Sequence, residues 1–120
     1  MFGKENIIVD KSKSFAIRII KLYQYLTETK KEYVMSKQIL RCGTSIGANI
    51  REAIRAQSKP DFYTKLYISL KEAEETLYWL ELLDECEYIE KTHFDSIYAD
   101  CQELVKILVA ITKNQGKTIS

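Results

Sequence analysis

Apolar side chains recur every three or four residues along almost the whole chain, which is the spacing of the buried face of an α-helix. On this basis we predict four helices, at about residues 12–29, 35–57, 60–86 and 93–113, after a short N-terminal arm. Small polar or acidic residues mark three of the expected starts: Asp10 or Ser12, then Ser58 with Pro60 and Asp61, then Thr92 with Asp95.

The inward-facing positions follow from the same periodicity. We expect Phe15, Ile19, Leu22 and Leu26 in the first helix, Ile39, Gly43, Ile46, Ile50 and Ala53 in the second, Phe62, Leu66, Leu70, Ala73, Leu77 and Leu80 in the third, and Phe94, Ile97, Cys101, Leu104, Val105 and Leu108 in the fourth. Helices joined by short connections pack most simply as antiparallel neighbours, so the prediction is an all-α, antiparallel up-down four-helix bundle that occupies residues 1–120 as one domain.

Two glycines, Gly43 and Gly47, lie inside the second predicted helix. Glycine in a helix interior costs up to ~1 kcal/mol relative to alanine, so its presence twice on one helix needs a compensating reason. The simplest reason is that another helix approaches closely at that point.

Composition supports a folded protein, with 46% hydrophobic and 29% charged residues, four glycines and one proline. No run of ~20 uncharged residues could span a membrane, and the first residues lack the apolar core of a secretion signal, so we expect a cytoplasmic protein without membrane contact. The three cysteines, Cys42, Cys86 and Cys101, are far apart and lie in apolar helical patterns, which fits reduced core thiols better than disulfides.

Charge is divided unevenly between the two halves of the chain. Residues 1–59 carry a net charge of +7 and residues 60–120 a net charge of −6, although the whole chain is +1. On the second helix Lys37, Arg41, Arg51 and Arg55 return to nearly the same direction and form one stripe. This basic stripe is either a solvated face, a contact for nucleic-acid phosphates, or a contact for the acidic half of a neighbouring subunit.

The third predicted helix has a second seam opposite its core positions. The seam comprises Ile68, Glu72, Glu75, Trp79, Leu82 and Cys86, and it should leave Trp79 and Leu82 exposed. An apolar patch of this kind is more typical of a protein interface than of a cofactor site. We therefore predict a self-association surface that includes Ile68, Trp79, Leu82 and Cys86, with a broader core as the alternative.

Residues for catalysis or metal binding do not form a complete set. The single histidine, His93, follows Glu90 at the spacing used in di-iron bundles, but those sites need two such motifs and two further carboxylates. No cysteine has a histidine nearby in sequence, and the glycines at 43–47 lack the remaining residues of a phosphate-binding loop. We expect no enzyme activity, no metal site and no cofactor.

The run from Leu40 to Leu83 resembles the four-helix bundle proteins encoded in 23S ribosomal RNA intervening sequences. The resemblance rests on Arg41, the Ser45-Ile46 and Asn49-Ile50 pairs, Glu52, the run 62–70, Ala73 and the segment 75–83. This chain reads Arg51-Glu52-Ala53 where the family often has Ala-Glu-Gly, and its net charge of +1 differs from strongly basic members.

The resemblance implies a bundle that assembles into a homopentameric ring. Related proteins are accessory factors of diversity-generating retroelements, in which a basic assembly is implicated in binding nucleic acid and a reverse transcriptase. Our leading hypothesis is therefore a non-enzymatic, ring-forming bundle that binds RNA or DNA through Lys37, Arg41, Arg51 and Arg55. The alternative is a scaffold for protein partners without affinity for nucleic acid.

Overall fold

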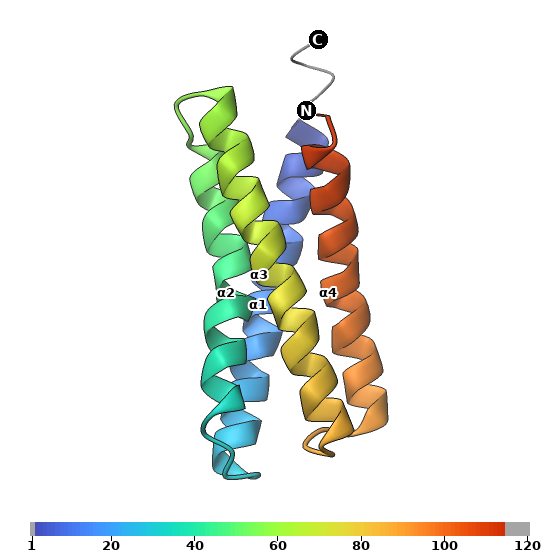
Figure 1. Ribbon diagram of the computed structural model, residues 1–120. Helices are drawn as coiled ribbons and strands as arrows, with labels where there is room; N and C mark the ends of the chain where they lie inside the picture. The colour runs from blue at the N-terminus through green and yellow to red at the C-terminus, as the bar shows by residue number, and fades with distance from the viewer. Residues whose placement is uncertain (1, 115–120) are drawn as a thin grey trace.

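The fold is a bundle of four antiparallel helices, seen in a computed structural model that describes residues 2–114, with side chains from residue 7 onward. The helices are α1 (Phe2–Glu28), α2 (Met35–Ile54), α3 (Lys59–Glu85) and α4 (Lys91–Thr112). Successive helices run in opposite directions and enclose one elongated core, with principal extents of 50 × 21 × 20 Å (Figure 1). The predicted all-α, four-helix class is confirmed.

Helix α1 begins ten residues before its predicted start, and the proposed caps at Asp10 and Ser12 are wrong. Ser12 is buried inside the helix, where its hydroxyl donates to the Val9 carbonyl at 3.1 Å. Ile8 is also buried one turn earlier, so the apolar period continues toward the N-terminus. A small polar residue on the inner face therefore resembles a helix start in sequence although it lies within the helix.

The other boundaries lie within three residues of prediction. Ser58 caps α3 as expected, because its hydroxyl accepts a hydrogen bond from the Asp61 amide at 3.3 Å. The cap predicted at Thr92 is wrong, since α4 starts at Lys91 after Glu90, which makes no side-chain cap bond. Helix α2 ends at Ile54, so Arg55 occupies the C-cap position.

Helix α1 packs closely against the glycine-bearing side of α2. A Cβ atom built on Gly43 would lie 2.8 Å from Cγ1 and 2.9 Å from Cγ2 of Ile19. At Gly47 the nearest atom would be the Ser12 hydroxyl oxygen, at 3.1 Å. The close approach of another helix predicted from the two glycines is thus present. At Gly43 the missing side chain leaves room for Ile19 of α1.

The core contains most of the predicted apolar positions, but the buried face of α3 is rotated toward α2. Phe62, Leu70 and Leu77 are half-buried at the margin, as is Val105 of α4. Ser69, Thr76 and Leu83 are fully buried instead, and Tyr63 is almost completely buried. Burial of the two hydroxyls is tolerated because each donates to a carbonyl: Ser69 to Ile46 at 2.8 Å and Thr76 to Glu72 at 2.7 Å.

Candidate functional site

The four residues of the basic stripe are all exposed along α2 and its C-cap. Arg41 differs from the other three because it forms ion pairs with carboxylates of α3. Its guanidinium bridges to α3, where it donates to Glu72 at 3.1 Å and also to Glu75. The hydrogen bond to Glu75 is the main reason why the pKa of Arg41 lies above its ordinary value. In the described part of the chain, no carboxylate pairs with Lys37, Arg51 or Arg55.

Neutralisation of Arg41 divides the basic stripe into two ends. Lys37 lies near the start of α2, whereas Arg51 and Arg55 lie ~21 Å or more further along the helix axis at 1.5 Å per residue. Between them the outer face of α2 carries the short uncharged side chains of Thr44 and Ala48. Arg41 therefore contributes to α2–α3 packing, and the free positive charge is at the two ends of α2.

Trp79 completes the contact between α2 and α3. Its indole nitrogen donates to Glu75 at 3.1 Å, and this bond is the largest cause that lowers the pKa of Glu75, followed by the bond from Arg41. Such exposed ion pairs contribute at most ~1 kcal/mol each. The network mainly orients these side chains on one surface, and it does not activate any group for chemistry.

Two residues of the predicted self-association surface on α3 are less exposed than expected. Trp79 and Leu82 are half-buried, so the expectation that both are exposed is wrong. Trp79 packs against the edge of the core, which agrees with the alternative of a broader core. Ile68 is exposed, and so is Cys86, which contradicts the expectation that all three cysteines are core thiols but agrees with its place in the predicted surface. Tyr78, which sequence reasoning missed, has 55% of its surface exposed.

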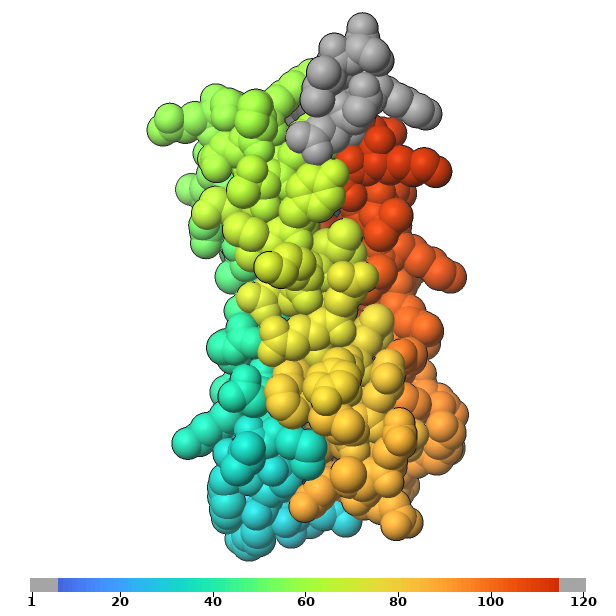
Figure 2. Space-filling view, in the orientation of Figure 1, coloured from blue at the N-terminus to red at the C-terminus, as the bar shows by residue number. Residues whose placement is uncertain are grey.

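Aromatic residues are consequently concentrated on the outer face of α3, which lies toward the viewer in Figure 2. The rings of Tyr78 and Trp79 meet edge to face with centroids 5.4 Å apart. Tyr67, three turns before Tyr78, is 43% exposed. The spacing of 11 residues between the two tyrosines is a sequence signal that could have identified this face.

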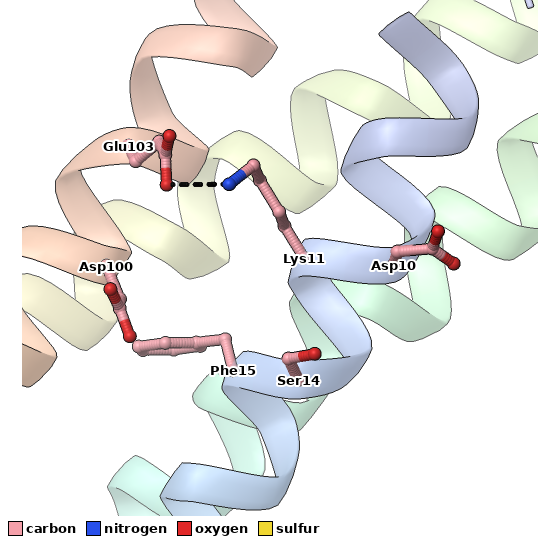
Figure 3. A pocket seen from close by; sticks show the side chains of 6 residues that line it. All are labelled: Asp10, Lys11, Ser14, Phe15, Asp100 and Glu103. Atoms are coloured by element: carbon pink, nitrogen blue, oxygen red, sulfur yellow. Dashed lines mark hydrogen bonds and ion pairs between the residues drawn. The ribbon is translucent and has the colours of Figure 1, made fainter. Parts of the chain in front are cut away.

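A groove of about 250 Å³ runs between α1 and α4 (Figure 3). Phe15 lines it, and Lys11 crosses it to pair with Glu103 at 3.2 Å. Arg18 makes a second bridge to Asp100 at 2.6 Å. The charges of these four side chains are thus paired between α1 and α4. Among the residues that line the groove, no nucleophile is hydrogen-bonded to a base.

The buried thiols are not activated. Burial raises the pKa of Cys42 to about 11 and also raises the pKa of Cys101, which is the opposite of what a nucleophilic thiolate needs. His93 is exposed in the first turn of α4. Among residues 2–114, no three histidine, cysteine or acidic side chains are grouped to hold a metal ion, and no helix is long and apolar enough to cross a membrane.

Glu32 is a structural residue that the sequence did not reveal. Its side chain is buried in the connection between α1 and α2, and its carboxylate accepts from the amides of Val34, Met35 and Ser36 at 3.1, 3.0 and 2.7 Å. The Ser36 hydroxyl donates back to the Glu32 carbonyl at 2.8 Å. This reciprocal arrangement caps α2 and immobilises the connection.

Known proteins similar to this chain share its whole architecture. Residues 4–110 match the family model described as 23S rRNA-intervening sequence protein. The chain is also similar to a crystal structure from Bacteroides thetaiotaomicron, of a protein with unknown function from the S23 ribosomal protein family, with a TM-score of 0.90 and 58% sequence identity. That similarity covers 92% of this chain and 98% of the other. No functionally curated protein matches.

Proposed function

The chain belongs to the 23S rRNA-intervening sequence protein family, and we propose that it is a non-enzymatic bundle that self-associates and binds RNA or DNA. The phosphate contacts come from three residues of the basic stripe, Lys37, Arg51 and Arg55, and the outer face of α3 supplies the contact between subunits. A head-to-tail contact closes into a ring when the rotation permits, and the family resemblance favours five subunits.

The observation that carries the proposal is the positive charge on α2 that its own chain does not neutralise. Lys37, Arg51 and Arg55 are exposed and have no ion-pair partner among the described residues. Phosphate binding by such side chains is sequence-independent and releases counterions, so affinity should fall steeply with salt. Arg41 of the predicted set is assigned here to packing against α3.

The test is to replace Lys37, Arg51 and Arg55 together with alanine and measure binding to structured RNA and to DNA across a salt series. Three lost phosphate contacts should reduce the slope of log affinity against log salt by roughly 2–3. A matched control replaces Lys13, Lys71 and Lys106, which are exposed on the other three helices and carry the same total charge. Equal losses in both triple variants would reject a specific role for α2.

Self-association through α3 is tested at two apolar side chains that are exposed on this helix, Ile68 and Tyr78. Ile68→Glu and Tyr78→Glu should lower the mass of the assembly in solution and leave helical content unchanged, because neither side chain is buried. Val109→Glu on α4 replaces an apolar residue of 45% exposure and serves as the control. A parent protein that is already monomeric would exclude this part of the proposal.

A second candidate is a scaffold for protein partners that has no affinity for nucleic acid. It is favoured by the neutralisation of Arg41 and by the small net charge of +1. Its signature is an intact oligomer that binds neither RNA nor DNA even at low salt. That outcome would assign Lys37, Arg51 and Arg55 to contacts between proteins.

A further inference from the structure

The connection between α1 and α2 exposes two apolar side chains at one end of the bundle. Tyr33 is 53% exposed and Val34 is 71% exposed, the latter being the highest value among the described large hydrophobic residues. No hydrogen bond within the described chain uses the Tyr33 hydroxyl. The connection lies at the lower end of the molecule beside the junction of α3 and α4 (Figures 1 and 2).

The backbone beneath Tyr33 is held rigidly. The preceding residue, Glu32, is anchored inside by three backbone amides, and Lys31 adopts the left-handed conformation with φ of 56°. An exposed aromatic ring on an ordered loop loses little conformational freedom when a ligand binds. Tyr33 is therefore presented as a preorganised surface.

Three lysines lie within four residues of Tyr33 in the sequence. Lys30, Lys31 and Lys37 are exposed, and none forms an ion pair in the described part of the chain. The carboxylate of Glu32 faces inward onto the start of α2, and Glu28 is the other acidic residue of the segment. Across the same end, the α3–α4 junction is acidic, which directs a polyanion toward the α1–α2 side.

We propose that Tyr33 stacks on an unpaired base of a single-stranded nucleic acid, with Lys30, Lys31 and Lys37 contacting the flanking phosphates. This inference rests on the proposed nucleic-acid binding and specifies its substrate class. A base within a duplex has both faces covered by its neighbours, so only an unpaired base can pack against the ring. Stacking tolerates any base, and hence sequence preference should be weak.

The size and position of the patch favour this ligand over a protein. Two exposed apolar side chains are far fewer than the 20 to 30 residues that each partner contributes to a stable protein interface, by the usual estimate of roughly 800 Å² per side. Lys37 also belongs to the basic stripe, so a strand bound at Tyr33 continues onto α2. A basic and aromatic patch also suits an anionic membrane surface, which the experiment distinguishes.

The experiment compares the full-length protein and three variants for binding to a 20-nucleotide oligouridine and to a 20-base-pair RNA duplex. Tyr33→Ala should weaken binding to the single strand by about 5- to 100-fold and binding to the duplex by less than about twofold, given the usual contribution of one stacked base. Tyr33→Phe should retain the parent affinity because the ring remains. Val109→Ala, which truncates an exposed apolar side chain on α4, is the control and should change neither.

The outcomes separate this inference from the proposed function. If the parent protein binds neither probe at low salt and also binds no DNA in the salt series, both are wrong; binding to duplex DNA alone would overturn only the stacking role. If it binds but Tyr33→Ala is unchanged, or loses both probes equally, the stacking role alone is wrong. Binding to vesicles of phosphatidylserine and phosphatidylcholine that requires Tyr33, with RNA binding that does not, would reassign the patch to a membrane surface.

Discussion

Replacing each of the two glycines of α2 by alanine should have opposite effects on stability. Both residues lie inside the same helix, so each substitution gains about 0.8–1 kcal/mol of helix propensity. The added methyl at Gly47 would meet the Ser12 hydroxyl at 3.1 Å, which rotation of that hydroxyl can relieve. We expect Gly47→Ala to stabilise the protein by roughly 0.5–1 kcal/mol.

At Gly43 the same methyl would overlap Ile19 at two carbon atoms, 2.8 and 2.9 Å away. Both belong to the branched part of a fully buried side chain, so no free rotation relieves the overlap. Overpacking of this kind costs about 1–3 kcal/mol, which exceeds the gain in helix propensity. Gly43→Ala should therefore be destabilising, by roughly 1 kcal/mol.

The assay is urea unfolding followed by far-ultraviolet circular dichroism, with fluorescence of Trp79 as a second probe. Measurements at several protein concentrations are needed because self-association adds to apparent stability. The difference in the free energy of unfolding between the two variants is the most informative quantity. The gain in helix propensity is the same in both and cancels, so the difference reports the cost of the overlap with Ile19. A Gly43→Ala variant at least as stable as Gly47→Ala would refute the reasoning.

A second variant pair isolates the overlap with Ile19. Ile19→Ala alone should cost about 2–5 kcal/mol, as other buried truncations do. In that background both overlapping carbon atoms are absent and a cavity adjoins Gly43. The effect of Gly43→Ala should therefore change sign and become stabilising, and an unchanged sign would assign the cost to the backbone of α2.

Three further predictions concern local features of the fold. Glu32→Ala should destabilise by about 1–3 kcal/mol because three amides lose their acceptor, whereas the exposed Glu28→Ala should have little effect on the urea midpoint. Glu87→Gly should stabilise by roughly 0.5–1 kcal/mol in the same assay, since Glu87 holds φ at 62° at the end of α3. The folded-state pKa of Cys42 is about 11 against 9.0 ordinarily, so unfolding releases a proton between these values and stability should fall as pH rises through them. Cys42→Ala should remove up to ~1.4 kcal/mol per pH unit of that slope.

The sequence predicts the number and order of the helices and most of their inner positions, because periodicity depends only on local geometry. It does not predict the rotation of one helix against another, and this rotation decides which polar residues are buried. Ser12, Ser69 and Thr76 look like surface residues in a one-dimensional pattern, yet each is buried with its hydroxyl satisfied by a carbonyl. The burial of Glu32 has a different cause: its partners are the backbone amides of residues 34–36, which no side-chain pattern marks in the sequence.

The basic stripe shows the same limit at the candidate site. Spacing along α2 correctly places Lys37, Arg41, Arg51 and Arg55 on the outside of the helix. Spacing cannot reveal that Glu72 and Glu75 of α3 are within reach of Arg41, because the register between two helices depends on how their cores interlock. The different role of Arg41 within the predicted set of four therefore follows only from the position of α3.

This role of Arg41 changes how a loss of nucleic-acid binding should be interpreted. Removing Arg41 leaves Glu72 and Glu75 without their cation, which adds negative potential beside the stripe. Affinity for a polyanion would then fall even if Arg41 never touches a phosphate. The informative comparison is Arg41→Ala alone against Arg41→Ala combined with Glu75→Gln, which has the same net charge as the parent. Recovery of affinity in the double variant would mean that Arg41 acts by neutralising its neighbours, whereas a persistent loss would return Arg41 to the phosphate-binding set.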